Sequence, residues 1–315
     1  MSIPIAAVFP GQGSQSIGML AELGAAHATV RQTFDEASAT LGYDLWTLVQ
    51  EGPVEDLNRT DRTQPAMLAA DVAVWRVWRE QGGAMPALMA GHSLGEYAAL
   101  VCAGALDFGR AVTLVAERGR FMQEAVPAGQ GAMAAVLGLD DERVREVCAA
   151  AAAGEVIAAV NFNSPGQVVI AGHATAVERA IGLAKEAGAK RALPLPVSVP
   201  SHCALMKPAA ERMAALLEET TFAAPAVPVL HNADVRSYSE GAAIRNALVR
   251  QLYSPVRWVE TVQDMVARGT RTMIEFGPGK VLSGLGKRID RELVAFCVQD
   301  TASLEEALTA QHGAV

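Results

Sequence analysis

The segment from residue 84 to residue 102 constrains the fold more than any other part of the chain. Residues 84–90 form a mostly apolar run that predicts a buried strand, and this run leads into Gly91-His92-Ser93-Leu94-Gly95. Residues 96–102 then favour a helix. A serine between two glycines, at a sharp turn from a strand into a helix, is typical of a nucleophile exposed above a sheet. The segment therefore predicts an α/β chain with Ser93 on a strained turn.

Strands and helices alternate along much of the remaining chain. Apolar runs at 3–9, 227–230, 272–276 and 294–298 predict buried strands, and residues 65–80 predict a long helix. Such alternation is typical of a mostly parallel sheet covered by helices. The chain has 315 residues, of which 51% are hydrophobic and 19% charged, so it can bury a large core and carry a smaller insertion.

The middle of the chain shows a different order of elements. Strands are predicted at 132–139, 156–161, 167–171 and 189–195, with helices at 141–153 and 175–187 and a turn at 163–166. The order βαββαβ is that of a ferredoxin-like unit. We therefore expect a ferredoxin-like subdomain at residues 129–198, inserted into a larger hydrolase-like α/β domain made of residues 1–128 and 199–315.

Charge and composition disfavour several classes of protein. The formal net charge of −8 argues against binding nucleic acid, which requires a basic surface. No apolar run reaches the roughly 18 residues that span a bilayer, and the N-terminus lacks the pattern of a signal peptide. The four cysteines form no C-x-x-C pair and no metal-ligand spacing. We expect a cytoplasmic protein that binds neither membrane nor metal.

Ser93 needs a base and an exposed position to act as a nucleophile. The glycines at 91 and 95 leave room for the tight turn, and the helix that follows directs its free N–H groups toward the serine. The backbone N–H of Leu94 is therefore the expected first donor to an oxyanion. The alternative is a glycine-rich turn that occurs by chance and has no chemical role.

The base must come from one of six histidines. His202 lies in Val199-Pro200-Ser201-His202, where a loop leaves the predicted subdomain and enters a helix, and catalytic groups concentrate in such loops. A surface or helix-capping histidine is the alternative. Asp107 and Glu117 fall between Ser93 and His202 without lying in an evident site, so a Ser–His pair without an acid stays open.

Arg118 falls on the apolar face of a helix that is predicted to begin after Asp107. Positions 111, 114, 115, 118 and 122 share that face, and all but Arg118 are apolar. A guanidinium in an apolar site needs an anion, because unpaired burial costs several kcal/mol. Arg118 could thus bind a substrate carboxylate through two parallel hydrogen bonds. A structural salt bridge or a snorkelling side chain is the alternative.

Several short motifs occur in a fixed order along the chain: Phe9-Pro10-Gly11-Gln12-Gly13-Ser14-Gln15, residues 91–97, Glu117-Arg118-Gly119, Asn161-Phe162-Asn163-Ser164-Pro165-Gly166-Gln167, Pro200-Ser201-His202 and Gly277-Pro278-Gly279-Lys280. With these motifs the chain resembles the acyltransferase family of fatty-acid and polyketide synthesis, and within it the stand-alone bacterial malonyl transferases. The likeness runs from about residue 3 to about residue 308 without a large gap.

The resemblance implies a role for each matching residue. Ser93 would be acylated, His202 would be its base, and Gln251 would orient His202 through its backbone carbonyl. Arg118 would bind the malonyl carboxylate. The backbone N–H of Gln12 would complete the oxyanion hole beside the first donor. No metal and no cofactor would be needed beyond the pantetheine arms of the substrates.

The resemblance also implies a reaction and its partners. The malonyl group of malonyl-CoA would pass through a malonyl-serine to the phosphopantetheine thiol of an acyl carrier protein, in ping-pong order, and supply fatty acid synthesis. Carrier proteins are acidic, so docking needs a basic patch. Candidate contacts of the carrier protein or coenzyme A are Asn163, Lys190, Arg191 and Lys280, with Lys287 and Arg288 as further members of the patch. We expect a monomer.

Two other functions remain open at this point. A serine esterase or thioesterase uses the same nucleophile but releases the acyl group to water, and simple esters offer no carboxylate to Arg118. A non-catalytic module that only binds carrier proteins would form no covalent adduct.

Overall fold

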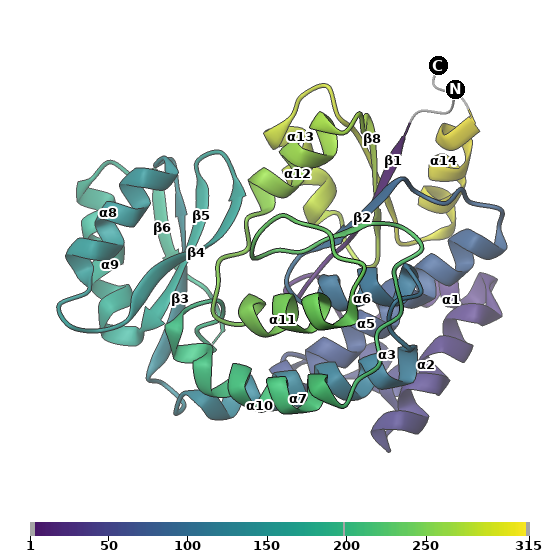
Figure 1. The fold of residues 1–315 in the computed structure, drawn as a ribbon, viewed down its shortest axis with the longest axis horizontal. Coiled ribbons are helices and arrows are strands. Elements are labelled where there is room, and N and C mark those ends of the chain that lie inside the picture. The colour runs from purple at the N-terminus through teal and green to yellow at the C-terminus, as the bar shows by residue number, and fades with distance from the viewer. Residues whose placement is uncertain (1–3, 198, 313–315) are drawn as a thin grey trace.

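A five-stranded sheet forms the centre of the larger domain (Figure 1). The structure is a computed structural model that describes residues 4–197 and 199–312. The sheet has the order β7-β2-β1-β8-β9, and every neighbouring pair runs parallel. Its strands are β1 (Ile5–Phe9), β2 (Leu88–Gly91), β7 (Val229–Leu230), β8 (Thr272–Phe276) and β9 (Val294–Val298). The predicted parallel sheet is confirmed; residue 3 of the first predicted strand lies outside the described residues.

Helices cover both faces of this sheet because its strands alternate their side chains between two apolar layers. Along β1, Ala7 and Phe9 join the core that contains α5 (Thr60–Glu80), α6 (Gly95–Cys102) and α7 (Phe108–Ala125). Ala6 and Val8 face the opposite core, beneath α12 (Trp258–Ala267) and α13 (Val281–Ile289).

Helix α5 begins before the position that the sequence predicts. It starts at Thr60 rather than at residue 65, because the N–H of Thr63 already bonds to the carbonyl of Arg59 at 2.7 Å. Strand β2 is shorter than the predicted run at 84–90, since pairing with the neighbouring strands β1 and β7 begins only at Leu88. The other helices of this domain are α1 (Ala21–Ala26), α2 (Ala28–Leu41), α3 (Leu45–Glu51), α4 (Val54–Leu57), the 3-10 helix η1 (Ala204–Met206), α10 (Lys207–Glu218), α11 (Gly241–Gln251) and α14 (Thr301–His312).

The smaller subdomain has the predicted ferredoxin-like order of elements. Its antiparallel sheet has the order β4-β5-β3-β6, and two helices, α8 (Asp141–Ala151) and α9 (Ala174–Glu186), pack on it. The strands are β3 (Gly131–Leu137), β4 (Ile157–Ser164), β5 (Gln167–His173) and β6 (Arg191–Pro194). The turn between β4 and β5 is shorter than predicted, because Ser164 and Gln167 already pair across the strands.

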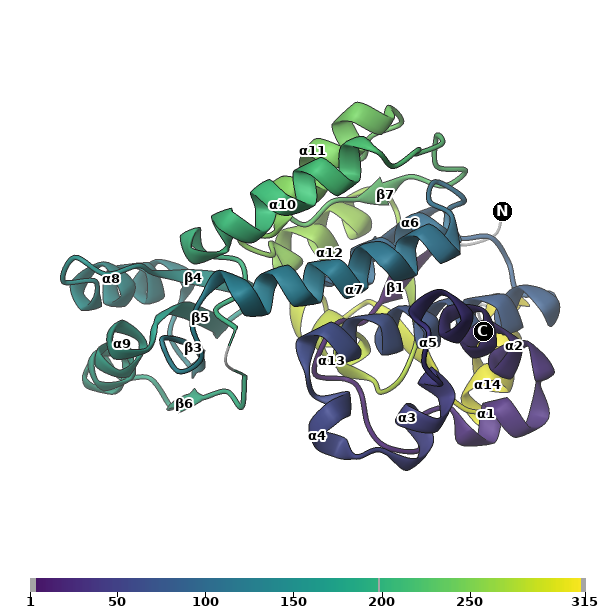
Figure 2. The same ribbon diagram turned by 90° about the horizontal axis from the view of Figure 1, so that it is seen from below.

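The subdomain is joined to the larger domain by backbone hydrogen bonds. The N–H of Phe162 in β4 donates to the carbonyl of Val256 at 3.0 Å, and the N–H of Val256 donates to the carbonyl of Val160 at 2.8 Å. Figure 2 shows α7 and α10 lying side by side and extending toward this sheet. The subdomain elements run from Gly131 to Pro194, inside the predicted limits 129–198. The limits themselves stay a prediction, and residue 198 is not among the described residues.

No described helix is both long enough and apolar enough to cross a membrane.

Candidate active site

Ser93 sits on a tight turn between β2 and α6. Its φ of 53° lies in the left-handed region, which costs a non-glycine residue free energy and is common where function demands an exposed side chain. A Cβ on Gly91 would lie 1.8 Å from the carbonyl carbon of Gly95, and one on Gly95 would lie 2.1 Å from the carbonyl oxygen of Phe9. Both positions therefore require glycine, because any side chain would overlap the backbone.

Asn232 holds this turn from the loop after β7. Its Oδ1 accepts from the N–H of Ser93 at 2.7 Å, and its Nδ2 donates to the carbonyl of Gly91 at 2.7 Å. One buried amide thus satisfies a donor and an acceptor of the strained backbone, which fixes the direction of the Ser93 side chain.

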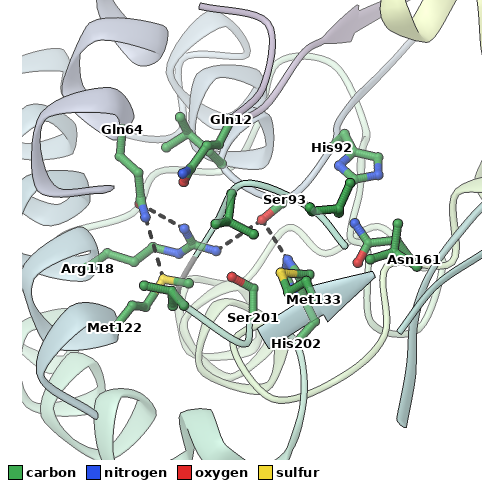
Figure 3. Close-up of a pocket in the computed structure, with 15 residues that line it drawn as sticks. Gln12, Gln64, His92, Ser93, Arg118, Met122, Met133, Asn161, Ser201 and His202 are labelled. Atoms are coloured by element: carbon green, nitrogen blue, oxygen red, sulfur yellow. Dashed lines mark hydrogen bonds between the residues drawn. The ribbon is translucent and has the colours of Figure 1, made fainter. Parts of the chain in front are cut away.

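His202 lies directly against the serine. Its Nε2 is 2.7 Å from the Oγ of Ser93, and its Nδ1 is 2.8 Å from the backbone carbonyl oxygen of Gln251 (Figure 3). A carbonyl oxygen can only accept a hydrogen bond, so Nδ1 carries the proton and Nε2 is free to accept one. No carboxylate among the described residues bonds to His202.

His202 is held in the neutral form. Burial first, and then the charges of Arg118 and His92, lower the pKa of His202 to about 3, and only the backbone hydrogen bonds oppose this shift. An uncharged imidazole at neutral pH is the form that can take a proton from the serine hydroxyl.

Arg118 projects from α7 toward the serine, and its side chain is 1% exposed. Nη2 donates to Oε1 of Gln251 at 2.9 Å and to the Oγ of Ser93 at 3.3 Å, while Nη1 donates to Oε1 of Gln64 at 2.8 Å. Nε has no partner, and no carboxylate pairs with Arg118 among the described residues. The guanidinium has five N–H donors, so part of its capacity remains open.

The expected oxyanion donors are two backbone N–H groups, of Leu94 and Gln12, and both residues line the same pocket as Ser93. Leu94 precedes the first residue of α6, and Gln12 follows β1. Gly11 packs so closely on this turn that a Cβ would lie 2.5 Å from the carbonyl oxygen of His92 and 3.8 Å from the nitrogen of Leu94. Within the described chain, neither N–H donates to another residue. Both N–H groups are therefore free to donate to another group.

These residues line a pocket of about 130 Å³ between the two sheets. The larger domain supplies its polar end, around Ser93, His202 and Arg118. The subdomain contributes Met133, Asn161, Val169, Leu195 and Val197, and the remaining lining residues are Gln12, Gln64, His92, Leu94, Met122, Val199 and Ser201. The pocket is thus polar where Arg118 and Ser93 meet and mostly apolar elsewhere.

The predicted carrier-protein contacts are spread over the surface. Lys190 and Arg288 line one recess together with residues 164–167, and Arg288 donates to Oε1 of Gln167 at 2.9 Å. Arg191 begins β6, and Lys280 precedes α13 at the end opposite to Lys287. All five side chains are exposed. Asn163 differs, since its Oδ1 lies 2.9 Å from Nε2 of His92 and it does not line the pocket, which Asn161 does.

Comparison with known proteins places the chain in a family. Residues 7–304 match the family described as "Acyl transferase domain". The chain belongs to this acyltransferase family. It is 62% identical to the malonyl CoA-acyl carrier protein transacylase of Salmonella typhimurium, over 96% of this chain and 98% of that one. It is 48% identical to the protein of the same name from Bacillus subtilis, over 96% of both chains.

Solved structures agree with this membership. The acyl carrier protein S-malonyltransferase of Vibrio cholerae is 63% identical, with a TM-score of 0.94 over 96% of this chain and 99% of that one. A malonyl-transacylase solved in complex with a type II PKS acyl-carrier protein is 60% identical, with a TM-score of 0.96 over 97% and 99% of the two chains. The predicted family is confirmed.

Sequence reasoning missed several residues of this acyltransferase site. Gln64 and Asn232 gave no signal, because their partners are remote in sequence and meet them only in the fold. Glu96 did offer a signal in the sequence, because it is a charged residue in the first turn of a helix whose other side chains are mostly apolar. Asp107 caps α7, as predicted, and Glu117 pairs with Arg120 at the surface. Neither belongs to the site.

No group of His, Cys, Asp and Glu side chains among residues 4–197 and 199–312 is arranged to hold a metal ion.

Proposed function

We propose that this acyltransferase moves the malonyl group of malonyl-CoA to the phosphopantetheine thiol of an acyl carrier protein, through a malonyl ester of Ser93. The observation that carries the proposal is the buried guanidinium of Arg118, which reaches the Ser93 hydroxyl and lacks an acidic partner among the described residues. A carboxylate on the acyl group would supply that partner. An uncharged acyl group would leave the guanidinium unpaired.

The first half-reaction uses the Ser93–His202 pair. His202 Nε2 takes the proton of the serine hydroxyl while Oγ attacks the thioester carbonyl, and the carbonyl oxygen becomes an oxyanion held by the N–H groups of Gln12 and Leu94. Coenzyme A leaves as the thiolate and receives the proton from His202. Each donor of the oxyanion hole is worth about 3 kcal/mol in comparable enzymes.

The second half-reaction reverses these steps with a different thiol. His202 takes the proton of the pantetheine thiol, the thiolate attacks the malonyl ester, and Ser93 regains its proton. The malonyl carboxylate also assists the base, because the charge of Arg118 is one cause of the low pKa of His202. Pairing Arg118 with a carboxylate offsets that charge and raises the pKa of His202.

The backbone carbonyl of Gln251 is proposed to orient His202, in place of the acid of a serine hydrolase triad. Support comes from the 2.8 Å contact at Nδ1. The steps need no metal and no cofactor beyond the pantetheine arms, since nucleophile, base and oxyanion donors are all residues of this chain. A monomeric state and a cytoplasmic location stay predictions.

Intact mass measurement tests the proposal. The protein mixed with malonyl-CoA should gain the mass of one malonyl group, and then lose it when a carrier protein with its phosphopantetheine arm is added. The carrier protein should gain the same mass, whereas a carrier protein without the arm should not. A thioesterase would lose the adduct to water at the same rate without the carrier protein. A module that only binds would show no adduct, and either result would refute the transferase.

The acylation rate should depend little on pH in the range where an ordinary histidine titrates. With the pKa of His202 at about 3, its Nε2 is almost entirely unprotonated from about pH 5 upward. We expect kcat/KM for malonyl-CoA to stay level from about pH 8 to about pH 5 and to fall only at lower pH, where Nε2 binds a proton. Tryptophan fluorescence at each pH controls for unfolding. If kcat/KM instead fell to half its maximum at about pH 6.5, the ordinary pKa of histidine, the imidazole of His202 would not be desolvated.

We also propose that the carrier protein docks over the recess beside β6. Lys190 and Arg288 line this recess and Arg191 adjoins Lys190, which places positive charge on the subdomain and on α13 at once. The basic side chains would attract the acidic carrier protein and guide its arm toward the pocket between the two sheets. Lys280 and Asn163 receive less support, since neither lines this recess.

Reversal of charge at the recess should slow the second half-reaction more than the first. In a Lys190→Glu/Arg191→Glu variant we expect transfer to the carrier protein to fall by about tenfold at low salt, and the difference to shrink as salt screens the charges. Stopped-flow transfer from malonylated enzyme measures this step. Lys185→Glu, on the exposed end of α9, is the matched control. Equal slowing in both variants would remove the recess from the docking surface.

A further inference from the structure

Glu96 is a buried carboxylate that the proposed chemistry does not use. It follows Gly95 in the first turn of α6 and is 0% exposed. Its Oε2 accepts from the N–H of Asn232 and from Nε2 of Gln251, both at 2.9 Å, and its Oε1 lies 2.7 Å from Nδ1 of His231. A buried charge is retained at a cost unless it is well bonded, and Glu96 has donors at both oxygens.

The bond to Gln251 determines which way that amide points. Its Nε2 donates to Glu96 and to the carbonyl oxygen of Ser93, which are both acceptors. Its Oε1 therefore faces Arg118 and accepts from Nη2 at 2.9 Å. The reverse orientation would bring an NH₂ group against the guanidinium and a carbonyl oxygen against Glu96. Because Oε2 of Glu96 also accepts from the N–H of Asn232, only the observed orientation satisfies every group.

Glu96 also supplies negative charge near Arg118 without forming an ion pair with it. No carboxylate of the described chain lies within ion-pair distance of Arg118, whereas Glu96 is one amide away, on the far side of Gln251. A direct ion pair would occupy donors that a substrate carboxylate needs. Glu96, which is linked to Arg118 only through Gln251, offsets part of the buried charge of Arg118 and leaves those donors open.

We propose that Glu96 is a positioning residue that acts through Gln251: it holds Arg118 in place and partly balances its charge, and so gives the site its preference for a carboxylate-bearing acyl group. This inference rests on the proposed malonyl transfer. A purely structural role is the alternative, because Glu96 also ties the His231–Asn232 loop to α6. The two roles differ in what happens to acyl groups that carry no charge.

The test compares the acylation of Ser93 by malonyl-CoA and by acetyl-CoA, each as kcat/KM from intact mass against time. In Glu96→Ala we expect the ratio of malonyl to acetyl to fall about tenfold or more, mainly through a higher KM for malonyl-CoA. Glu96→Gln keeps the acceptor for Gln251 but removes the charge, and we expect a fall of about threefold. A Glu96→Ala/Gln251→Ala double variant should lose little more than Gln251→Ala alone, because both act on one contact.

Glu275→Ala is the matched control. Glu275 is equally buried and accepts from the N–H groups of Leu282 and Ser283 at the start of α13, without a bond to Gln251 or Arg118. It should lower the melting temperature and leave the ratio unchanged. A ratio that stays at the wild-type value in folded Glu96→Ala, or in Glu96→Gln if the alanine variant does not fold, overturns the inference. Absence of malonyl transfer in the wild type would instead refute the proposed function.

Discussion

Ser93→Ala is expected to abolish the malonyl adduct and to lower malonyl transfer by about 10⁴-fold or more, because the nucleophile cannot be replaced by water or by a neighbouring group in the same position. Alanine tolerates a φ of 53° no worse than serine does, and Asn232 bonds to the backbone N–H rather than to the side chain. The variant should therefore fold. Intact mass after incubation with malonyl-CoA measures the adduct, and turnover of the carrier protein measures the transfer.

Ser201→Ala provides the control for this experiment. Ser201 lines the same pocket beside His202, but no hydrogen bond joins its hydroxyl to the base among the described residues. That variant should still form the malonyl adduct. An adduct in Ser93→Ala, or none in Ser201→Ala, would assign the nucleophile to another residue.

Arg118→Ala is expected to change which acyl group the enzyme prefers. Loss of the guanidinium should lower kcat/KM for malonyl-CoA by about 10²-fold or more, the usual cost of removing one partner of a buried charge pair. Acetyl-CoA brings no carboxylate, so its acylation rate should stay level or rise. The rate with acetyl-CoA can rise because the charge of Arg118 lowers the pKa of His202. Removing that charge raises the pKa and makes His202 a stronger base.

Arg120→Ala is the control for the loss of a guanidinium from α7. Arg120 lies at the surface and pairs with Glu117 and Glu124, so both substrates should react as in the wild type. Equal losses for malonyl-CoA and acetyl-CoA in Arg118→Ala would mean that Arg118 supports the fold rather than the substrate carboxylate.

The large elements of the fold are local properties of the sequence. The alternation along β1 places Ala7 and Phe9 in one core and Ala6 and Val8 in the other, as a period of two requires. The ends of elements are less predictable, because they depend on partners. Strand β2 ends where its neighbours stop pairing, and Ser164 belongs to β4 because Gln167 lies opposite to it.

The position of Arg118 on the apolar face of α7 could also be predicted, since helical phase is local. What could not be predicted is that its partners are amides. Gln64 comes from α5 and Gln251 from α11, and nothing in either helix marks the residue as a neighbour of Arg118. The same holds for Asn232, whose amide supports the turn of Ser93 from a distant loop.

The sequence by itself predicted the strand, turn and helix around Ser93, because an apolar run leads into glycines that can adopt a tight turn with close backbone packing. It also placed Arg118 on the apolar face of its helix. The family resemblance implied the carbonyl of Gln251 as the partner of the base, and the structure has this contact. Only the tertiary structure decided that Arg118 bonds to Gln64 and Gln251, and that Glu96 reaches Arg118 through Gln251. These contacts join segments far apart in the chain, and the distance between such segments is set by the packing of whole layers rather than by any local pattern.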